Sequence, residues 1–230
     1  MMRREAVLLG VDFDGTLAPL VDHPDLAVPD PRGLDALRVL ANRPGVLVAV
    51  VSGRALADLA LRLGELPGAI LVGEHGNDIG EEVDAPAVLD DARAHLGRLQ
   101  EQFPGATVET KRSSVTFHTR GLEPGEARTA EEAIRDWAAR HGGITLLEGK
   151  NVFELTVATR TKGDAISDLG VDSDGIVYVG DDLTDETVFD RLGERDIGVK
   201  VGPGETSARY RVDDVTDVVS LLEMMSTAPG

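Results

Sequence analysis

Two stretches of the chain combine a short apolar run with carboxylates placed directly at its end. Residues 6–11 lead into residues 12–16, which read DFDGT, and residues 175–180 lead into residues 181–185, which read DDLTD. A continuous apolar run is typical of a strand that is buried on both faces of a parallel sheet. Ligands bind outside the carboxyl ends of such strands, so these two runs constrain both the fold and the place of any chemistry.

The apolar residues elsewhere predict an α/β order at both ends of the chain. Further strands and the helices between them are expected at residues 34–40 (helix), 46–51 (strand), 56–63 (helix), 69–72 (strand), 162–169 (helix), 184–192 (helix), 196–199 (strand) and 214–224 (helix). Strands that alternate with helices favour a parallel sheet with helices on its faces.

The pattern changes between these two parts. A helix, two strands, a second helix and two more strands are expected in turn, at residues 87–102, 107–110, 114–119, 124–141, 144–147 and 152–156. This order favours an α+β layer with helices on one face of an antiparallel sheet. We therefore expect a discontinuous core, residues 1–82 and 158–230, with a cap inserted at residues 83–157.

The composition excludes several classes of protein. The chain has 23 Lys and Arg against 41 Asp and Glu, and this net charge of −18 opposes electrostatically driven binding to nucleic acid. It has no cysteine, which fits a reducing compartment. Its apolar runs, such as residues 46–51, are far shorter than the roughly 18 residues of a membrane span. We expect a soluble cytoplasmic protein with no membrane or nucleic-acid partner; we favour a monomer but leave the oligomeric state open.

The polar residues at the strand ends suit phosphoryl transfer. Asp12 can accept a phosphoryl group as a nucleophile, and Asp14, two residues on, can protonate the leaving alkoxide and then activate water. The two acidic clusters would repel each other unless a hard cation such as Mg²⁺ lay between them. Lys162 and Ser52, which follows the strand at residues 46–51, supply local donors for the phosphoryl oxygens.

These residues resemble the haloacid dehalogenase superfamily of phosphohydrolases. Its four motifs are matched by residues 12–16, Ser52, Lys162 and residues 180–185. The resemblance implies a Rossmann-like core with a parallel sheet and an inserted α+β cap of type 2. It also implies Mg²⁺ as cofactor, held by Asp12, the main-chain carbonyl of Asp14, and Asp181, with Asp185 and Asp182 in support.

A closer resemblance is to the trehalose-6-phosphate phosphatase family. Residues 11–31 and 180–189 are similar to its first and fourth motifs, and residues 74–76, 109–120 and 149–155 to further segments, with Thr119 where tyrosine is usual. This resemblance implies hydrolysis of trehalose 6-phosphate to trehalose and phosphate through an aspartyl phosphate. The sugar would be bound by the cap residues Lys111, His118, Arg120, Lys150 and Glu154.

Alternative interpretations remain for several of these residues. Ser52 could be a helix N-cap, Lys162 a solvated lysine in a first turn, and Arg54 the partner of a surface carboxylate. Thr16, Arg54 and His75 are expected to contact the substrate. Thr16 could instead be only a turn hydroxyl, and His75 could bind only backbone groups.

The function has alternatives too. The sugar phosphate could be sucrose phosphate, a glucosylglycerol phosphate or a trehalose-like pseudo-sugar phosphate, and a phosphomutase or a non-catalytic sugar-phosphate sensor could use the same scaffold. Asp14 favours catalysis over a sensor, because hydrolysis of an alkyl phosphate needs a general acid and binding does not.

Overall fold

The computed structural model describes residues 6–21, 23–80 and 86–228. The chain divides into two compact units. The first unit combines Met1–Gly80 with Arg160–Gly230, and the second is Glu81–Thr159. The second unit is thus inserted into the sequence of the first.

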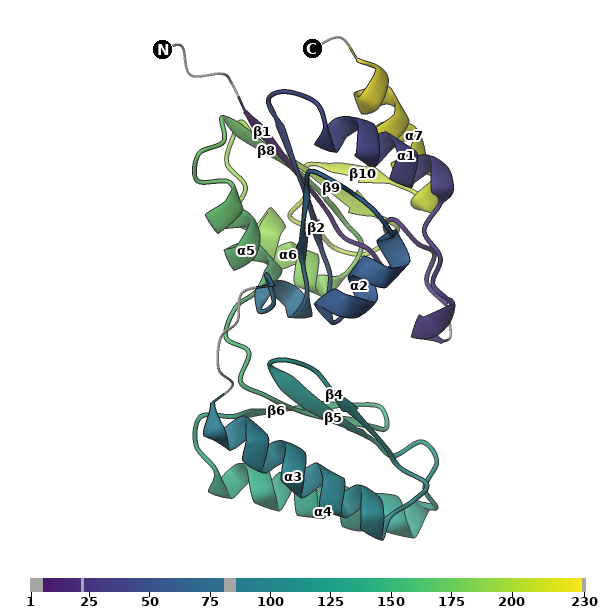
Figure 1. Ribbon diagram of the computed structural model, residues 1–230, viewed down its shortest axis with the longest axis vertical. Coiled ribbons are helices and arrows are strands. Elements are labelled where there is room, and N and C mark those ends of the chain that lie inside the picture. The colour runs from purple at the N-terminus through teal and green to yellow at the C-terminus, as the bar shows by residue number, and fades with distance from the viewer. Residues whose placement is uncertain (1–5, 22, 81–85, 229–230) are drawn as a thin grey trace. The chain divides into compact units, whose positions relative to one another are not determined.

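The first unit is built on a parallel sheet of six strands (Figure 1). The strand order is β10-β9-β8-β1-β2-β3, and all neighbouring pairs are parallel. The strands are β1 (Val7–Val11), β2 (Val46–Val51), β3 (Ala69–Val72), β8 (Gly175–Gly180), β9 (Ile197–Val201) and β10 (Tyr210–Val212). β1 lies between β8 and β2, which explains why its sequence is apolar on both faces.

Helices cover both faces of this sheet. On one face, Leu9 and Val11 of β1 share a core with α1 (Pro31–Ala41), α2 (Leu56–Leu63) and α7 (Val215–Thr227). On the other face, Leu8 shares a core with α5 (Lys162–Leu169) and α6 (Leu183–Phe189). The alternation of side chains along β1 therefore feeds both cores.

The second unit packs two helices on one face of an antiparallel sheet. The sheet order is β4 (Thr107–Thr110), β5 (Ser114–His118), β7 (Val152–Thr156) and β6 (Thr145–Gly149). The helices α3 (Ala87–Gln102) and α4 (Pro124–Arg140) lie along the same side of this sheet (Figure 1). They share a core with β5 and β7, in which Trp137 is buried. This is the α+β layer expected from the sequence.

The α/β fold predicted from the sequence is confirmed, with differences at the ends of elements. The structure adds β10, which pairs with β9 at the edge of the sheet, and two short 3-10 helices, η1 (Pro24–Leu26) and η2 (Glu74–Gly76). β10 has only three residues, of which two are exposed, so it lacks the apolar run that reveals a buried strand.

Candidate active site

Three parallel strands bring the predicted chemical groups to one edge of the sheet. Val11 of β1 lies beside Val50 of β2 and Val179 of β8. The pairing continues one residue further, because the backbone N–H of Asp12 donates to the Val179 carbonyl at 2.9 Å. Side chains that follow these strands therefore start from neighbouring positions, as the carboxyl ends of parallel strands require.

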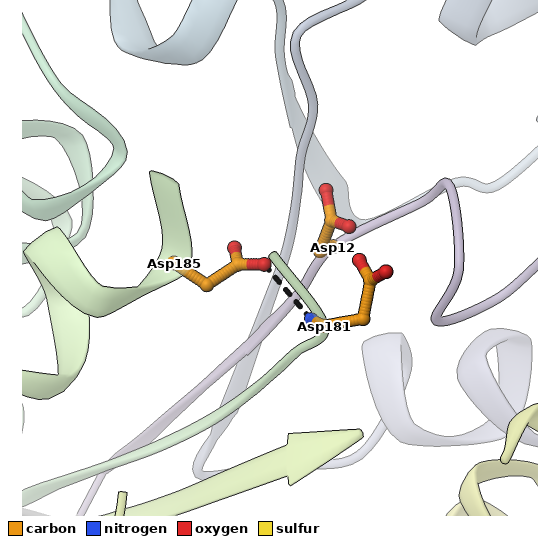
Figure 2. Close-up of side chains that lie close together, drawn as sticks. All are labelled: Asp12, Asp181 and Asp185. Carbon is orange, nitrogen blue, oxygen red and sulfur yellow. Dashed lines mark hydrogen bonds between the residues drawn. The ribbon is translucent and has the colours of Figure 1, made fainter. Parts of the chain in front are cut away.

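Asp12, Asp181 and Asp185 form an acidic cluster at this edge (Figure 2). Each offers one carboxylate oxygen, and the three oxygens lie within 4.8 Å of one another. The side chain of Asp12 is 4% exposed and that of Asp185 is fully buried. Like charges at this separation and burial are costly unless a positive charge compensates them.

Lys162 is the cation that faces this cluster, from the first turn of α5. Its Nζ donates to Asp12 Oδ1 at 2.7 Å and to Asp185 Oδ1 at 2.9 Å, and its side chain is 2% exposed. Burial alone would lower the pKa of this ammonium, but the carboxylates of Asp12, Asp185 and Asp182 raise it above its ordinary value. Lys162 is therefore a buried, protonated lysine and not a solvated one.

The sequence around Lys162 fixes its position. Thr161 and Asp164 form a capping box: Thr161 Oγ1 accepts from the Asp164 N–H at 3.1 Å, and Asp164 Oδ2 accepts from the Thr161 N–H at 2.8 Å. A Cβ atom at Gly163 would overlap the carbonyl oxygen of Thr187 in α6. Glycine at this position allows α5 and α6 to approach closely.

One lysine does not compensate three carboxylates. Burial raises the pKa of Asp12 well above its ordinary value, and burial together with the charges of Asp182 and Asp185 raises the pKa of Asp181 to about 6. Asp181 Oδ1 is buried and has no hydrogen-bond partner among the described residues. An orphaned carboxylate oxygen in an acidic cluster fits a hard divalent cation, which binds oxygen ligands.

The carboxylates of Asp185 and Asp182 already have several donors. Asp185 Oδ1 also accepts from the hydroxyl of Tyr178 at 2.7 Å, and Asp185 Oδ2 accepts from the backbone N–H groups of Asp181 at 2.9 Å and Asp182 at 3.0 Å. Asp182 is the N-cap of α6, where its Oδ1 accepts from the Thr184 N–H at 2.8 Å. Asp185 thus organises the loop, and Asp182 lies outside the cluster.

Asp14 pairs with Arg54 instead of joining the acidic cluster. The guanidinium Nε and Nη2 atoms donate to Asp14 Oδ2 at 2.7 Å and Oδ1 at 2.6 Å. Ser52 Oγ accepts from the Arg54 N–H at 3.2 Å, and the N-cap of α2 is Ala55, so Ser52 is not a helix cap. The hydroxyl of Thr16 is buried and has no hydrogen-bond partner within the described ranges.

His75 lies in a turn that is bound to the loop after β2. The backbone N–H of His75 donates to the Ser52 carbonyl at 2.9 Å, and that of Glu74 donates to the Arg54 carbonyl at 2.8 Å. Both turn residues have positive φ angles, 56° for His75 and 48° for Glu74, which is uncommon for residues other than glycine. A Cβ atom at Gly53 would overlap the His75 imidazole, so glycine leaves room for this ring.

The residues predicted to bind the sugar lie in the second unit. Thr116 of β5 pairs with Glu109 of β4 and with Glu154 of β7. Its neighbours Val115 and Phe117 are buried against the helices. Because side chains alternate along a strand, Thr116 and its two partners lie on the opposite face of the sheet.

Glu109 links two of these predicted residues. Its carboxylate lies 3.4 Å from His118 Nε2 and 3.8 Å from Lys111 Nζ. Arg120 and Lys150 are exposed, at or beyond the ends of β5 and β6. The predicted residues thus fall into two groups, one at the strand ends of the first unit and one on the sheet of the second.

Sequence reasoning missed three residues that hold this site together. Tyr178 binds Asp185, Asp58 binds Arg54 at 2.7 Å, and the buried Lys200 donates to the Asp181 carbonyl and, at 2.9 Å, to that of Val201. A signal for Tyr178 and Lys200 was present, because each is a polar side chain inside an otherwise apolar strand. Asp58 gave none, since an acidic residue in a first helical turn is common.

Comparison with known proteins decides the family. The family model described as trehalose-phosphatase matches residues 10–216. The chain belongs to the trehalose-phosphatase family. The predicted family is thereby confirmed, and the chain is a member of a family of phosphoric monoester hydrolases.

Individual relatives agree with this assignment. The chain is 37% identical over 95% of its length to a bifunctional trehalose-6-phosphate synthase/phosphatase from Thermoproteus tenax, of which it spans 32%. It is 35% identical over 94% of its length to a trehalose-6-phosphate phosphatase from Escherichia coli K12, of which it spans 85%. The C-terminal domain of Candida albicans trehalose-6-phosphate phosphatase has the same fold: the TM-score is 0.71 at 24% identity, with 98% of this chain and 93% of that one covered.

Within the described part of this trehalose-phosphatase family member, no helix is both long and apolar enough to cross a membrane.

We predict that Asp181→Asn stabilises the protein in EDTA at pH 8. The pKa of Asp181 is about 6 in the folded chain against 3.8 ordinarily, so its favourable contribution to stability at low pH is lost as the pH rises through 6. Calorimetry should show a melting temperature raised by roughly 2–4 °C at pH 8, the shift that ~1 kcal/mol produces in a chain of this size, and no gain below about pH 4. Asp136→Asn, at an exposed position on α4, is the control. An equal gain at both pH values would contradict this electrostatic account.

Proposed function

We propose that the protein is a Mg²⁺-dependent phosphatase that hydrolyses trehalose 6-phosphate to trehalose and phosphate. The observation that carries the proposal is the buried pairing of Asp12 with Lys162 at 2.7 Å, at the end of the central strand of a trehalose-phosphatase fold. A nucleophilic carboxylate beside a fixed cation suits phosphoryl transfer, in which positioning and charge stabilisation supply most of the catalysis.

Asp12 acts as the nucleophile. Lys162 holds its Oδ1, which fixes the carboxylate at the strand end. A carboxylate oxygen of Asp12 forms a bond to phosphorus while the bond from phosphorus to the sugar oxygen breaks, which gives an aspartyl phosphate. Water then attacks this phosphorus, the bond to Asp12 breaks, and inorganic phosphate leaves.

Asp14 is the general acid and base of the two steps. In its protonated form it gives a proton to the sugar oxygen as that oxygen departs and becomes a carboxylate; in the second step this carboxylate takes a proton from the attacking water, which restores the protonated form. The same residue therefore returns to its starting state after each turnover.

Three side chains contact the phosphoryl oxygens in this proposal. Lys162 supplies the charge, and the hydroxyls of Ser52 and Thr16 supply donors. The buried Thr16 Oγ1, which lacks a partner among the described residues, supports this role, because an unsatisfied buried hydroxyl is costly in the absence of a ligand.

The acidic cluster is the proposed Mg²⁺ site. Asp12, Asp181 and the main-chain carbonyl of Asp14 would hold the ion, and Asp185 and Asp182 would support the loop. When bound, Mg²⁺ neutralises charge on the phosphoryl oxygens and on the cluster itself.

The second unit, Glu81–Thr159, contains the cap expected at residues 83–157, and this cap is proposed to recognise the sugar. Lys111, His118, Arg120, Lys150 and Glu154 combine cationic donors with a carboxylate acceptor, a set that suits a hydroxyl-rich ligand. In the first unit, His75 is proposed to contact the substrate as well. Arg54 was also expected to contact the substrate. Its guanidinium binds Asp14, and we assign it the role of holding that carboxylate. The ligand is a small sugar phosphate, and we place the enzyme in the cytoplasm as a monomer.

A substrate panel tests this function. Purified protein should release phosphate from trehalose 6-phosphate with Mg²⁺ and not with EDTA, and Asp12→Asn should reduce turnover by at least about 10³-fold because it removes the nucleophile. The variant is nearly isosteric, so its melting curve should show a folded protein. Asp213→Asn, at an exposed position, is the control. The proposed substrate would be wrong if the kcat/KM for glucose 6-phosphate, sucrose phosphate or another sugar phosphate were roughly tenfold higher than that for trehalose 6-phosphate.

A second test separates sugar recognition from chemistry. Glu154→Gln should lower kcat/KM for trehalose 6-phosphate by roughly 10–100-fold, with less than about a threefold change for p-nitrophenyl phosphate, because the small ester has no sugar to bind.

Glu148→Gln is the matched control for this test. Glu148 lies on the neighbouring strand β6 but binds Arg135 of α4 at 2.8 Å, on the helix side of the sheet. The Glu148→Gln variant should leave kcat/KM unchanged for both trehalose 6-phosphate and p-nitrophenyl phosphate. Equal losses for the two substrates in Glu154→Gln would argue against a role in sugar binding.

A further inference from the structure

Asp14 is held by an arginine whose position is itself fixed. Two nitrogens of Arg54 bind the two oxygens of Asp14 at 2.7 and 2.6 Å, which is the bidentate geometry that a guanidinium favours. The Arg54 side chain is 9% exposed, and its Cζ lies 5.1 Å from the centre of the Phe13 ring. The Phe13 ring thus packs against one side of the guanidinium plane, and Asp14 binds one of its edges.

The other edge of Arg54 is held by Asp58. Arg54 Nη1 donates to Asp58 Oδ2 at 2.7 Å. Asp58 lies in the first turn of α2, four residues after Arg54, and belongs to none of the segments predicted from the sequence to carry chemistry. It is one-third exposed, and Asp14 is exposed to a similar degree.

Asp58 is fixed in turn by Arg62, one turn further along α2. Arg62 Nε donates to Asp58 Oδ2 at 2.9 Å, and Nη2 lies 2.9 Å from Oδ1. Arg62 is 12% exposed and also donates to the carbonyls of Asp25 at 3.0 Å and Ala27 at 3.2 Å. These contacts connect α2 to the loop that follows β1, and so to the chain segment that carries Asp14.

A general acid needs this kind of support. A displacement of about 1 Å from the reactive geometry costs on the order of 10²-fold in rate. An arginine side chain loses rotamer entropy when it is fixed, so a second contact at its other edge helps it to hold a carboxylate in one place. Asp58 supplies that second contact.

We propose that Asp58 is a positioning residue for Asp14, and that it acts through Arg54. The proposal rests on the proposed role of Asp14 as general acid and base. When Asp58 is neutralised, a weaker contact to an amide oxygen replaces the ion pair at Arg54 Nη1, and the guanidinium then positions Asp14 less precisely.

The chemistry of the leaving group makes this role measurable. In the first step the bond between phosphorus and the leaving oxygen breaks, and a sugar alkoxide needs the proton of Asp14 at that moment. p-Nitrophenolate is a stable anion and leaves without one. A misplaced Asp14 therefore slows transfer from an alkyl phosphate far more than transfer from p-nitrophenyl phosphate.

The experiment is a single-turnover comparison on Asp58→Asn. With enzyme in excess and Mg²⁺ present, rapid quench measures release of trehalose from trehalose 6-phosphate, and stopped flow measures release of p-nitrophenol. We expect the first rate to fall by roughly 10–100-fold and the second to stay within about twofold. Asp35→Asn is the matched control, because Asp35 forms an exposed ion pair with Arg38 on α1 at 2.7 Å, and it should change neither rate.

Equal losses for the two substrates, or no loss for either, would overturn the positioning role. If Asp58→Asn does not fold, Asp58→Glu takes its place: it keeps the charge but shifts the carboxylate, and it should slow only the alkyl phosphate, by a smaller factor. If the wild-type protein does not cleave trehalose 6-phosphate, the proposed function fails, and an alkyl phosphate that it does cleave tests Asp58 with the same two rates.

Discussion

The contact between the buried Lys162 and a cluster of three carboxylates, two of them buried, is the constraint on which the site depends. Lys162 contacts Asp12 and Asp185, and burial, together with the charges of Asp182 and Asp185, raises the pKa of Asp181 to about 6. A divalent cation bound at this cluster would compensate the excess negative charge. The same charge balance would favour binding of a divalent cation, which we propose to be Mg²⁺, and, with that ion bound, of a phosphoryl group.

The fold holds these charges in place through short-range structure. The end of β1 delivers Asp12, the capping box at Thr161 orients Lys162, and the carboxylate of Asp185 organises the loop after β8. Each of these devices is local in sequence, and the parallel sheet brings them together. Asp14 is positioned differently, by an arginine that reaches across from the loop after β2.

The sequence predicted the parts of this structure whose signal is local. Apolar runs predicted the buried strands, and Asp12, Ser52 and Asp181 were identified as candidates because they directly follow such runs. Strand β10 was missed because it is short and partly exposed. Contacts between distant side chains were not predictable. Tyr178 stands out as a polar side chain in an apolar strand, but the sequence does not indicate its partner, Asp185. Nothing in the sequence links Asp14 to Arg54, because that pair forms only once β1 and β2 are adjacent.

The central claim is that phosphate passes through Asp12. Wild-type protein, mixed with trehalose 6-phosphate labelled in its phosphate group and quenched in acid within milliseconds, should carry label on a peptide that contains residue 12. The label should be lost in a chase with unlabelled substrate, as an aspartyl phosphate requires. Full turnover without labelled protein at any quench time, or a label that maps to another residue, would contradict this account.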